Sequence, residues 1–342
     1  MHNTILLHNS HWANNIGNSF FTLGVKYILE NTFEDSKVIQ TDQLSTLAWH
    51  QPRFLIEKND LKYPSYSEPD WFVLSGPMFQ KKPMNKLIPV FERVFSNNDK
   101  TKLIIMNAGS IGYDKEEVKY CRSVLKKYNP YLFTTRDEFT YEHYADLAEN
   151  SYNGFDTAFF CSDYFTKYET PKLGDYCTFT FDKIVEPKIN LNGFDEEDKN
   201  TWNNLTINHR LKLPFRINKY FDLIRNFPQE SAGRKIVRPT HKIQGNNSIE
   251  LFRLPNSFVS QTPFGYLNLY ANTDLTISDR VHACIPTLAF GNAAMLISST
   301  KRKALFSRLN LDDINGNIIK IDQSYLKEEK DKYLDYMKNL SI

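Results

Sequence analysis

Residues 276–283 read Thr-Ile-Ser-Asp-Arg-Val-His-Ala, and this stretch carries the clearest indication of the fold. A predicted apolar strand over 275–278 runs into charged residues and then directly into a helix that we expect to begin at residue 281. Strands that lead straight into helices are typical of α/β proteins, whose ligands bind outside the carboxyl ends of the strands. We therefore expect Arg280 and His282 to lie at a binding edge.

Asp279, Arg280 and His282 together suit the binding of a small anion. The start of a helix offers free N–H groups and a favourable dipole for negative charge. The planar guanidinium of Arg280 matches a carboxylate or a phosphate, and the imidazole of His282 can transfer protons near neutral pH. We predict that Arg280 and His282 are catalytic and that Asp279 contacts the substrate. The alternative is structural, with an Asp279–Arg280 ion pair and His282 capping the helix.

The rest of the second half repeats this alternation of strands and helices. Arg238 and His241 follow a strand predicted over 235–237, so we treat both as substrate-binding candidates at the same kind of edge. A plain polar loop is the alternative for this pair. Further strands are predicted over 257–260, 294–298 and 318–321, and helices over 266–272, 281–289 and 327–340.

The first half also alternates, which predicts βαβ units and a mostly parallel sheet. Arg136 follows one strand, and Asn15, Gly17 and Asn18 form a turn between the first strand and the first helix, so these four are further substrate-binding candidates. Arg136 alternatively forms only a salt bridge and cap. The turn lacks the dinucleotide fingerprint and the P-loop spacing. Strands are predicted over 4–7, 38–40, 71–74, 102–106, 131–134 and 155–160, and helices over 19–30, 85–95, 115–127 and 140–147.

A chain of 342 residues is too long for one core, so we expect two domains. Residues 165–233 show little periodicity, and we place the boundary there, giving domains over 1–190 and 191–342. We expect the C-terminal helix to pack back on the first domain.

The composition excludes several classes of protein. A net charge of +2 argues against bulk nucleic-acid binding. The four cysteines form no C-x-x-C pair, so we expect no structural zinc, no other metal site and a reducing cytoplasmic location. The sequence shows no signal peptide and no apolar run near the ~20 residues of a transmembrane helix; association with a membrane surface stays open. H-E-x-x-H and G-x-S-x-G motifs are absent, and no carboxylate pair of a glycosidase stands out.

Several segments together resemble the polysaccharide pyruvyl transferase family over roughly residues 14–300. The most specific is the 279–283 segment, which looks like the D-R-[LV]-H-[AG] block of that family. Others are similar to its N-x-G-D turn, its R-D-x-x-S/T segment with Tyr141, its D-x-A-F strand and its A-x-G-x-P stretch; these lie at 15–18, 135–141, 155–159 and 290–292. Asn18 stands where the family usually has Asp, and Asn292-Ala293 replaces its G-x-P turn.

The resemblance implies two Rossmann-like domains that face each other across a cleft, as in GT-B glycosyltransferases. It implies phosphoenolpyruvate as the donor substrate, without a further cofactor, bound on the C-terminal side by Arg280 and His282. It also implies a glycan or lipid-linked saccharide as the acceptor on the N-terminal side. We hypothesise that Arg280 clamps the donor and that His282 is the general acid and base, assisted by Arg136 and His241. Two alternatives remain open: a GT-B glycosyltransferase that uses a nucleotide sugar, and a catalytically silent component of a glycan assembly complex.

Overall fold

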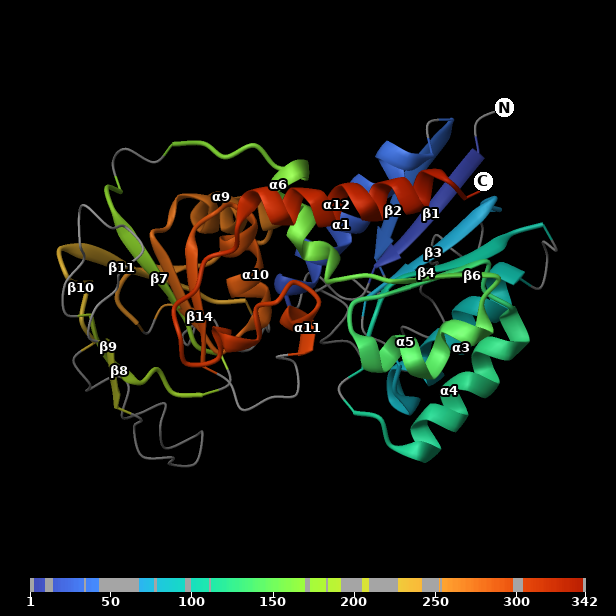
Figure 1. Cartoon of the computed structure of the whole chain (residues 1–342), viewed down its shortest axis with the longest axis horizontal. Helices are drawn as coiled ribbons and strands as arrows, with labels where there is room; N and C mark the ends of the chain where they lie inside the picture. The colour runs from blue at the N-terminus through green and yellow to red at the C-terminus, as the bar shows by residue number, and fades with distance from the viewer. Residues whose placement is uncertain are drawn as a thin grey trace.

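The computed structural model describes residues 3–9, 15–33, 35–42, 68–76, 79–95, 100–110, 112–169, 173–182, 184–191, 205–208, 227–241, 252, 254–297 and 304–340. Within them the chain forms two α/β halves, each built on its own sheet (Figure 1).

The first sheet has six strands in the order β2-β1-β3-β4-β5-β6, and every neighbouring pair is parallel, as the alternation predicted. Successive side chains of a strand point to opposite faces. Leu6 accordingly packs into a core on one face, whereas Ile5 and Leu7 pack into the core on the other. The strands are β1 (Asn3–Asn9), β2 (Ser36–Asp42), β3 (Trp71–Ser75), β4 (Lys102–Ala108), β5 (Leu132–Thr135) and β6 (Asn150–Asn153).

Helices cover both faces of this sheet, so its central strands are apolar on both sides. The face that holds Leu6 is covered by α3 and α4, which contribute Phe91 and Leu125 to its core. The opposite face is covered by α1. Asp114 caps the start of α4 by accepting the N–H groups of Glu116 and Glu117. These helices are α1 (Gly17–Thr32), α3 (Lys81–Phe95), α4 (Lys115–Tyr128) and α5 (Glu138–Tyr144), followed by the short η4 (Ala145–Leu147).

The second sheet is ordered β10-β11-β7-β13-β14, with β12 paired to β11. All of its pairs are parallel except the short β10–β11 pair. Its strands are β7 (Tyr176–Thr180), β10 (Glu230–Ser231), β11 (Arg234–Pro239), β12 (Ser257–Phe258), β13 (Leu275–Ser278) and β14 (Ala293–Leu296), and its helices include α9 (Pro263–Asn272) and α10 (Val281–Ala289). A separate antiparallel pair is formed by β8 (Lys188–Leu191) and β9 (Leu205–Asn208).

Strand β7 lies between β11 and β13 in the middle of the second sheet. The expected division at 190/191 had assigned these residues to the first domain. All five residues of β7 are buried, but Thr178 and Thr180 interrupt its apolar pattern. Because β7 belongs to the second sheet, the second half of the molecule begins before Tyr176.

The strand predicted over 155–160 is wrong. Its apolar residues form the 3-10 helix η5 (Thr157–Phe160) and the first turn of α6 (Cys161–Tyr164), while the sixth strand is the polar segment β6. Asp156 favours the helical start because its carboxylate accepts the N–H of Ala158. The strand expected over 318–321 is reduced to a single bridge between Ile319 and Ala294.

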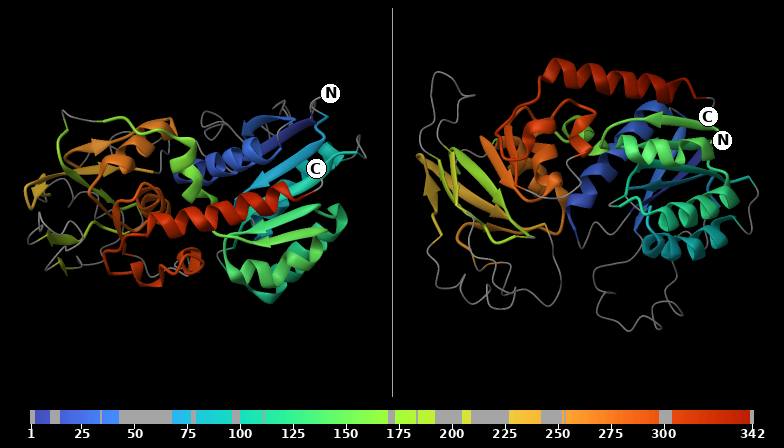
Figure 2. Two further views of the ribbon diagram at one scale, coloured as in Figure 1. Left: turned by 45° about the horizontal axis from the view of Figure 1, so that its top comes forward. Right: turned by 60° about the horizontal axis from the view of Figure 1, so that its bottom comes forward.

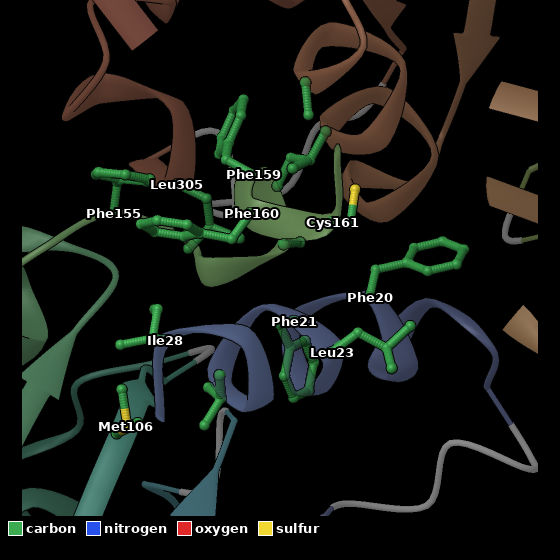
Figure 3. Close-up of a cluster of buried hydrophobic side chains, with 14 of the residues drawn as sticks. Phe20, Phe21, Leu23, Ile28, Met106, Phe155, Phe159, Phe160, Cys161 and Leu305 are labelled. Carbon is green, nitrogen blue, oxygen red and sulfur yellow. The ribbon is translucent and has the colours of Figure 1, made fainter. Parts of the chain in front are cut away.

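One continuous apolar core joins the two halves. It includes Phe20 and Phe21 of α1 and Phe159 and Phe160 of η5 (Figure 3). Cys284 of α10 belongs to the same core. Because η5 and α6 pack between α1 and α10, the halves share buried surface rather than meeting only through linkers.

Helix α12 (Gln323–Lys338) follows α11 (Ala304–Ser307) and η7 (Asp312–Ile314) and returns to the first half (Figures 1 and 2). Tyr333 donates a hydrogen bond to Thr134 Oγ1 at 2.6 Å, and Tyr336 donates one to the carbonyl of Ser151 at 2.9 Å. Asp322 caps the helix through the N–H groups of Ser324 and Tyr325. Among the described residues, no helix combines the length and apolarity that crossing a bilayer demands.

Candidate functional site

The turn between β13 and α10 positions Arg280 and His282. Arg280 is the N-cap residue of α10, and its backbone N–H bonds to Ser278 Oγ at 2.9 Å. The Asp279 carboxylate accepts the N–H groups of Asp182 at 3.2 Å and Ile184 at 2.8 Å. Asp279 therefore fixes the loop that follows β7 at the same edge of the sheet.

Arg280 reaches from the second half to the first. Its Nη2 donates a hydrogen bond to Asn15 Oδ1 at 2.7 Å, and its Nε lies 3.4 Å from a carboxylate oxygen of Asp182. Asn15 in turn donates to Asn18 Oδ1 at 3.1 Å. Nη1 of Arg280 makes no hydrogen bond within the described ranges, and the residue keeps 6 % of its surface exposed. The structure thus brings Arg280, Asn15 and Asn18 together and leaves one guanidinium nitrogen for a ligand.

Asp156 links His282 to Arg136 across the two halves. One of its oxygens, Oδ2, accepts a hydrogen bond from Arg136 Nη1 at 3.0 Å and lies 3.2 Å from His282 Nε2. Burial raises the pKa of this carboxyl, but the neighbouring His282 and Arg136 outweigh burial and lower the pKa to about 2. Asp156 is therefore ionised at neutral pH and holds the hydrogen on Nε2 of His282.

His241 is completely buried next to these groups. Its Nε2 lies 2.6 Å from the hydroxyl of Tyr270, and its Nδ1 has no partner within the described residues. Burial, followed by the charges of Arg280 and His282, lowers the pKa of His241 well below its usual value. The imidazole is consequently neutral at physiological pH and acts as a hydrogen-bonding group rather than as a cation.

Gly17 lets the start of α1 approach both imidazoles. A Cβ at this position would lie 3.0 Å from Cβ of His282 and 3.2 Å from Nδ1 of His241. The backbone N–H of Ile16 also bonds to the carbonyl of His241 at 2.9 Å. The glycine turn of the first half is therefore fitted directly against the histidines of the second.

Arg238 does not join this group through any hydrogen bond of the described chain. Its guanidinium binds Glu186 through two hydrogen bonds of 2.8 and 2.9 Å and also donates to the carbonyls of Pro228 and Pro255. Phe227 packs against it, with the guanidinium carbon 5.6 Å from the ring centroid. Arg238 therefore lies buried within β11, held by Glu186, and not in the polar loop that was the alternative for it.

Three buried polar atoms near these strand ends have no partner among the described residues. They are Nε of Arg136, Nδ2 of Asn107 and Nδ1 of His241. An unsatisfied buried group costs about 1–3 kcal/mol, so such atoms are rare and are typical of sites that bind a ligand or water. Their convergence at strand ends from both halves supports a binding site there.

Asp156 and Asn107 were not predicted as site residues from the sequence. Asn107 is the next-to-last residue of β4 and has a left-handed φ of 57°; its Oδ1 accepts the N–H of Thr157 at 2.9 Å. The signal for Asp156 was present in the D-x-A-F segment, but that segment was interpreted only as a strand. Its contact with His282 spans 126 positions of the chain, which no local pattern reveals.

Two solved structures with the same overall arrangement define the class of fold. The S. aureus MnaA–UDP structure has a TM-score of 0.51 and 11 % identity, covering 98 % of this chain and 90 % of its own. A structure of UDP-N-acetylglucosamine 2-epimerase has a TM-score of 0.51 and 12 % identity, covering 99 % and 90 %. The protein is therefore an α/β protein with two Rossmann-like domains of the GT-B type.

The sequence model of the polysaccharide pyruvyl transferase family matches residues 15–299. The chain belongs to this family, as its motifs suggested. No curated protein sequence matches it.

Proposed function

We propose that the protein transfers the pyruvyl group of phosphoenolpyruvate onto two hydroxyls of a sugar as a ketal. The observation that carries this proposal is the bridging cluster, in which Arg280 meets Asn15 and His282 meets Asp156 and Arg136 at the strand ends of both halves. Family membership supports the same reaction class.

The donor needs fixed cations because it carries both a phosphate and a carboxylate. Arg280 provides a guanidinium whose Nη1 is not hydrogen-bonded within the described residues, at the start of α10 where the helix dipole also favours an anion. Arg136 faces the same junction, and its Nε has no hydrogen-bond partner among the residues that the structure describes. We assign Arg280 to the primary contact with the donor and Arg136 and His241 to supporting contacts.

His282 supplies the proton chemistry in this proposal. Its imidazolium protonates C3 of phosphoenolpyruvate, which makes C2 electrophilic, and one sugar hydroxyl bonds to C2 and gives its proton back to His282. The C2–O bond to phosphate then breaks, and phosphate leaves with the electron pair. The second hydroxyl bonds to C2, and its proton leaves with the phosphate, so that the ketal and inorganic phosphate are the products.

The acceptor is proposed to be a sugar of a polysaccharide or of its lipid-linked precursor, bound from the first half. Phosphoenolpyruvate is a metabolite of the cytoplasm, so the reaction is placed there.

The direct test is incubation with phosphoenolpyruvate and a panel of pyranosides, with phosphate release and the mass of the sugar as readouts. We expect equal amounts of phosphate and of sugar carrying one pyruvyl group. MnaA, which shares the fold, was solved with UDP. Release of a nucleoside diphosphate from a sugar nucleotide, without any reaction of phosphoenolpyruvate, would replace this proposal with a glycosyltransferase.

Arg280→Lys is the informative variant because it keeps the charge but removes the planar fork. We expect it to weaken phosphoenolpyruvate binding in a thermal-shift titration. Unchanged donor binding by this variant would contradict the assignment of Arg280.

A further inference from the structure

A hollow of about 450 Å³ lies on the outer surface of the first half, beside α4 and α5, and none of its lining residues belongs to the site described above. Four of them are basic and follow one another at intervals of four, three and four residues along α4: Lys115, Lys119, Arg122 and Lys126. Residues at these intervals share one face of a helix. The cations therefore form a stripe about 16 Å long at a rise of 1.5 Å per residue.

The four cations differ in whether a carboxylate of the described residues forms an ion pair with them. Arg122 is held by Asp146 through two hydrogen bonds of 2.6 and 2.7 Å and also donates to the carbonyl of His143. Lys115, Lys119 and Lys126 are exposed and form no ion pair within the part of the chain that the structure describes. The stripe thus keeps a net positive charge toward solvent.

Aromatic rings mark one end of the hollow. Tyr113 lines it, and its ring centroid lies 5.6 Å from that of Phe139, which is 53 % exposed. Helices α4 and α5 lie side by side here (Figure 1), joined by the contact of Arg122 with His143. Phe139 thus places an exposed apolar ring beside the basic stripe.

The same end of the hollow adjoins the functional site. Tyr113 donates a hydrogen bond to Asp137 Oδ1 at 2.6 Å, and Asp137 directly follows Arg136. Gly109, at the end of β4, lies against the side chains of both Arg136 and Asp137. A chain that lies along the stripe would therefore reach the carboxyl edge of the first sheet.

The hollow and the basic stripe along it are together called the groove. We propose that this groove binds an acidic stretch of the acceptor, so that the acceptor is a saccharide chain that bears carboxylates. The inference rests on the proposed function and names its substrate class. Cations spread over about 16 Å match anions repeated along a chain better than one compact diphosphate. A concave hollow suits a chain that enters it, whereas a bilayer presents a broad surface.

The test is a calorimetric titration of the full chain with oligogalacturonate, a carboxylated saccharide, at low and at high salt. A neutral maltooligosaccharide of equal length and vesicles containing phosphatidylglycerol are the comparison probes. The groove variant is K115Q/K119Q/K126Q. Its matched control is K167Q/K320Q/K338Q, which removes three exposed lysines elsewhere on the surface.

We expect the unaltered protein to bind oligogalacturonate and to lose affinity as salt rises, because exposed charges are screened. The groove variant should bind about tenfold more weakly, which corresponds to three exposed ionic contacts, and the control should be unchanged. Equal binding by the groove variant, equal binding of the neutral saccharide, or binding of the vesicles alone would overturn the inference.

Phosphoenolpyruvate binding by the same proteins separates this inference from the proposed function. The groove lies outside the donor site, so the groove variant should bind phosphoenolpyruvate normally. Groove-dependent saccharide binding in a protein that does not bind phosphoenolpyruvate would leave the groove in place and contradict the pyruvyl transfer.

Discussion

The carboxylate of Asp156 is completely buried, accepts a hydrogen bond from Arg136 and lies 3.2 Å from His282. Two cationic or proton-carrying groups from different halves thus depend on one anion for their orientation. The same arrangement of a carboxylate that orients an imidazole is widespread in acid–base catalysis.

Asp156→Asn should therefore lower kcat by about a hundredfold, because His282 loses the anion that holds its proton on Nε2. An amide is similar in size, so donor binding should fall much less than turnover. Steady-state phosphate release at saturating phosphoenolpyruvate measures the effect. Asp331→Asn, an exposed carboxylate on α12, is the control and should be fully active. Full activity of Asp156→Asn would remove Asp156 from the mechanism.

The buried, neutral imidazole of His241 should make the stability of the protein depend on pH. Its pKa in the folded protein is lowered well below 6.5, first by burial, whereas the unfolded chain takes up a proton near 6.5. The unfolded state then binds more protons, so this contribution to stability is present above pH 6.5 and is lost as the pH falls. The free energy of unfolding should drop by up to about 1.4 kcal/mol for each pH unit below 6.5.

Urea unfolding between pH 7.5 and 5.5 measures this slope. His241→Gln should be less stable at pH 7.5 but should show a shallower decline, because its side chain takes up no proton. His143→Gln, which changes a histidine with a hydrogen bond to the Phe139 carbonyl near the surface, should keep the slope of the unaltered protein. Parallel curves for the His241 variant and the unaltered protein would contradict the buried neutral imidazole.

At the scale of elements, the contact of α1 with η5 has almost no free space. A Cβ at Gly24 would lie 1.8 Å from the carbonyl oxygen of Thr157, which is a backbone atom and cannot rotate away. Thr157 also donates its hydroxyl to the carbonyl of Phe21 at 2.9 Å. The close approach of these two elements therefore requires glycine.

Gly24→Ala should destabilise the protein by about 2–3 kcal/mol through overpacking, although alanine in a helix interior ordinarily stabilises by about 1 kcal/mol relative to glycine. The sign of the change is thus the diagnostic result. Gly112→Ala is the control, because a Cβ there meets no atom within 4 Å. Urea unfolding of both variants provides the comparison, and a stabilised Gly24→Ala protein would show that α1 and η5 are not in close contact.

The sequence predicted those elements whose buried residues form an apolar pattern within a few consecutive positions. Strands such as β3 and β4 are nearly all buried and read as uninterrupted apolar runs. Strand β7 was missed because Thr178 and Thr180 face the interior, where Thr178 is bonded to Thr276 of β13 at 2.5 Å. Its partner strand lies about a hundred residues away, so a local window of sequence does not show the group that satisfies the hydroxyl.

The apolar run over 155–160 shows the opposite difficulty. A short buried run fits a strand and a helical turn equally well, and the choice depends here on the cap that Asp156 provides. For the site, the rule that ligands bind at the carboxyl ends of parallel strands predicted a common edge. The structure brings these candidates together near one junction: Arg280, His282, His241, Arg136 and the glycine turn. Arg238 also lies near the end of a strand, but its guanidinium is bound by Glu186. No local sequence pattern distinguishes an arginine that faces the site from one that forms a buried ion pair elsewhere.

At the scale of the whole molecule, two sheets share one apolar core. That core contains Ile5 of the first sheet and Leu296 of the second, and α12 adds Tyr333 to it. Tyr333 packs with Phe155 and Phe160 at ring-centroid distances of 5.9 and 5.7 Å. Domains of this size ordinarily have separate cores and can unfold separately.

The shared core predicts that both halves unfold in a single transition in scanning calorimetry. Tyr333→Ala should lower the free energy of unfolding by about 3–5 kcal/mol, as expected for removal of a large buried aromatic ring. It should also separate the single transition into two, because α12 then holds the first half less tightly. Lys327→Ala, on the exposed side of the same helix, is the control and should keep one transition.

The same variant connects stability to catalysis, because the Arg280–Asn15 and His282–Asp156 contacts both cross the junction. If α12 maintains this junction, Tyr333→Ala should lose activity at temperatures where both halves are still folded. Within the described chain, Tyr333 makes no hydrogen bond or ring contact with Arg280 or His282. Phosphate release measured below the first calorimetric transition tests this. Two resolved transitions in the unaltered protein, or full activity of the variant, would show that the halves act independently of the shared core.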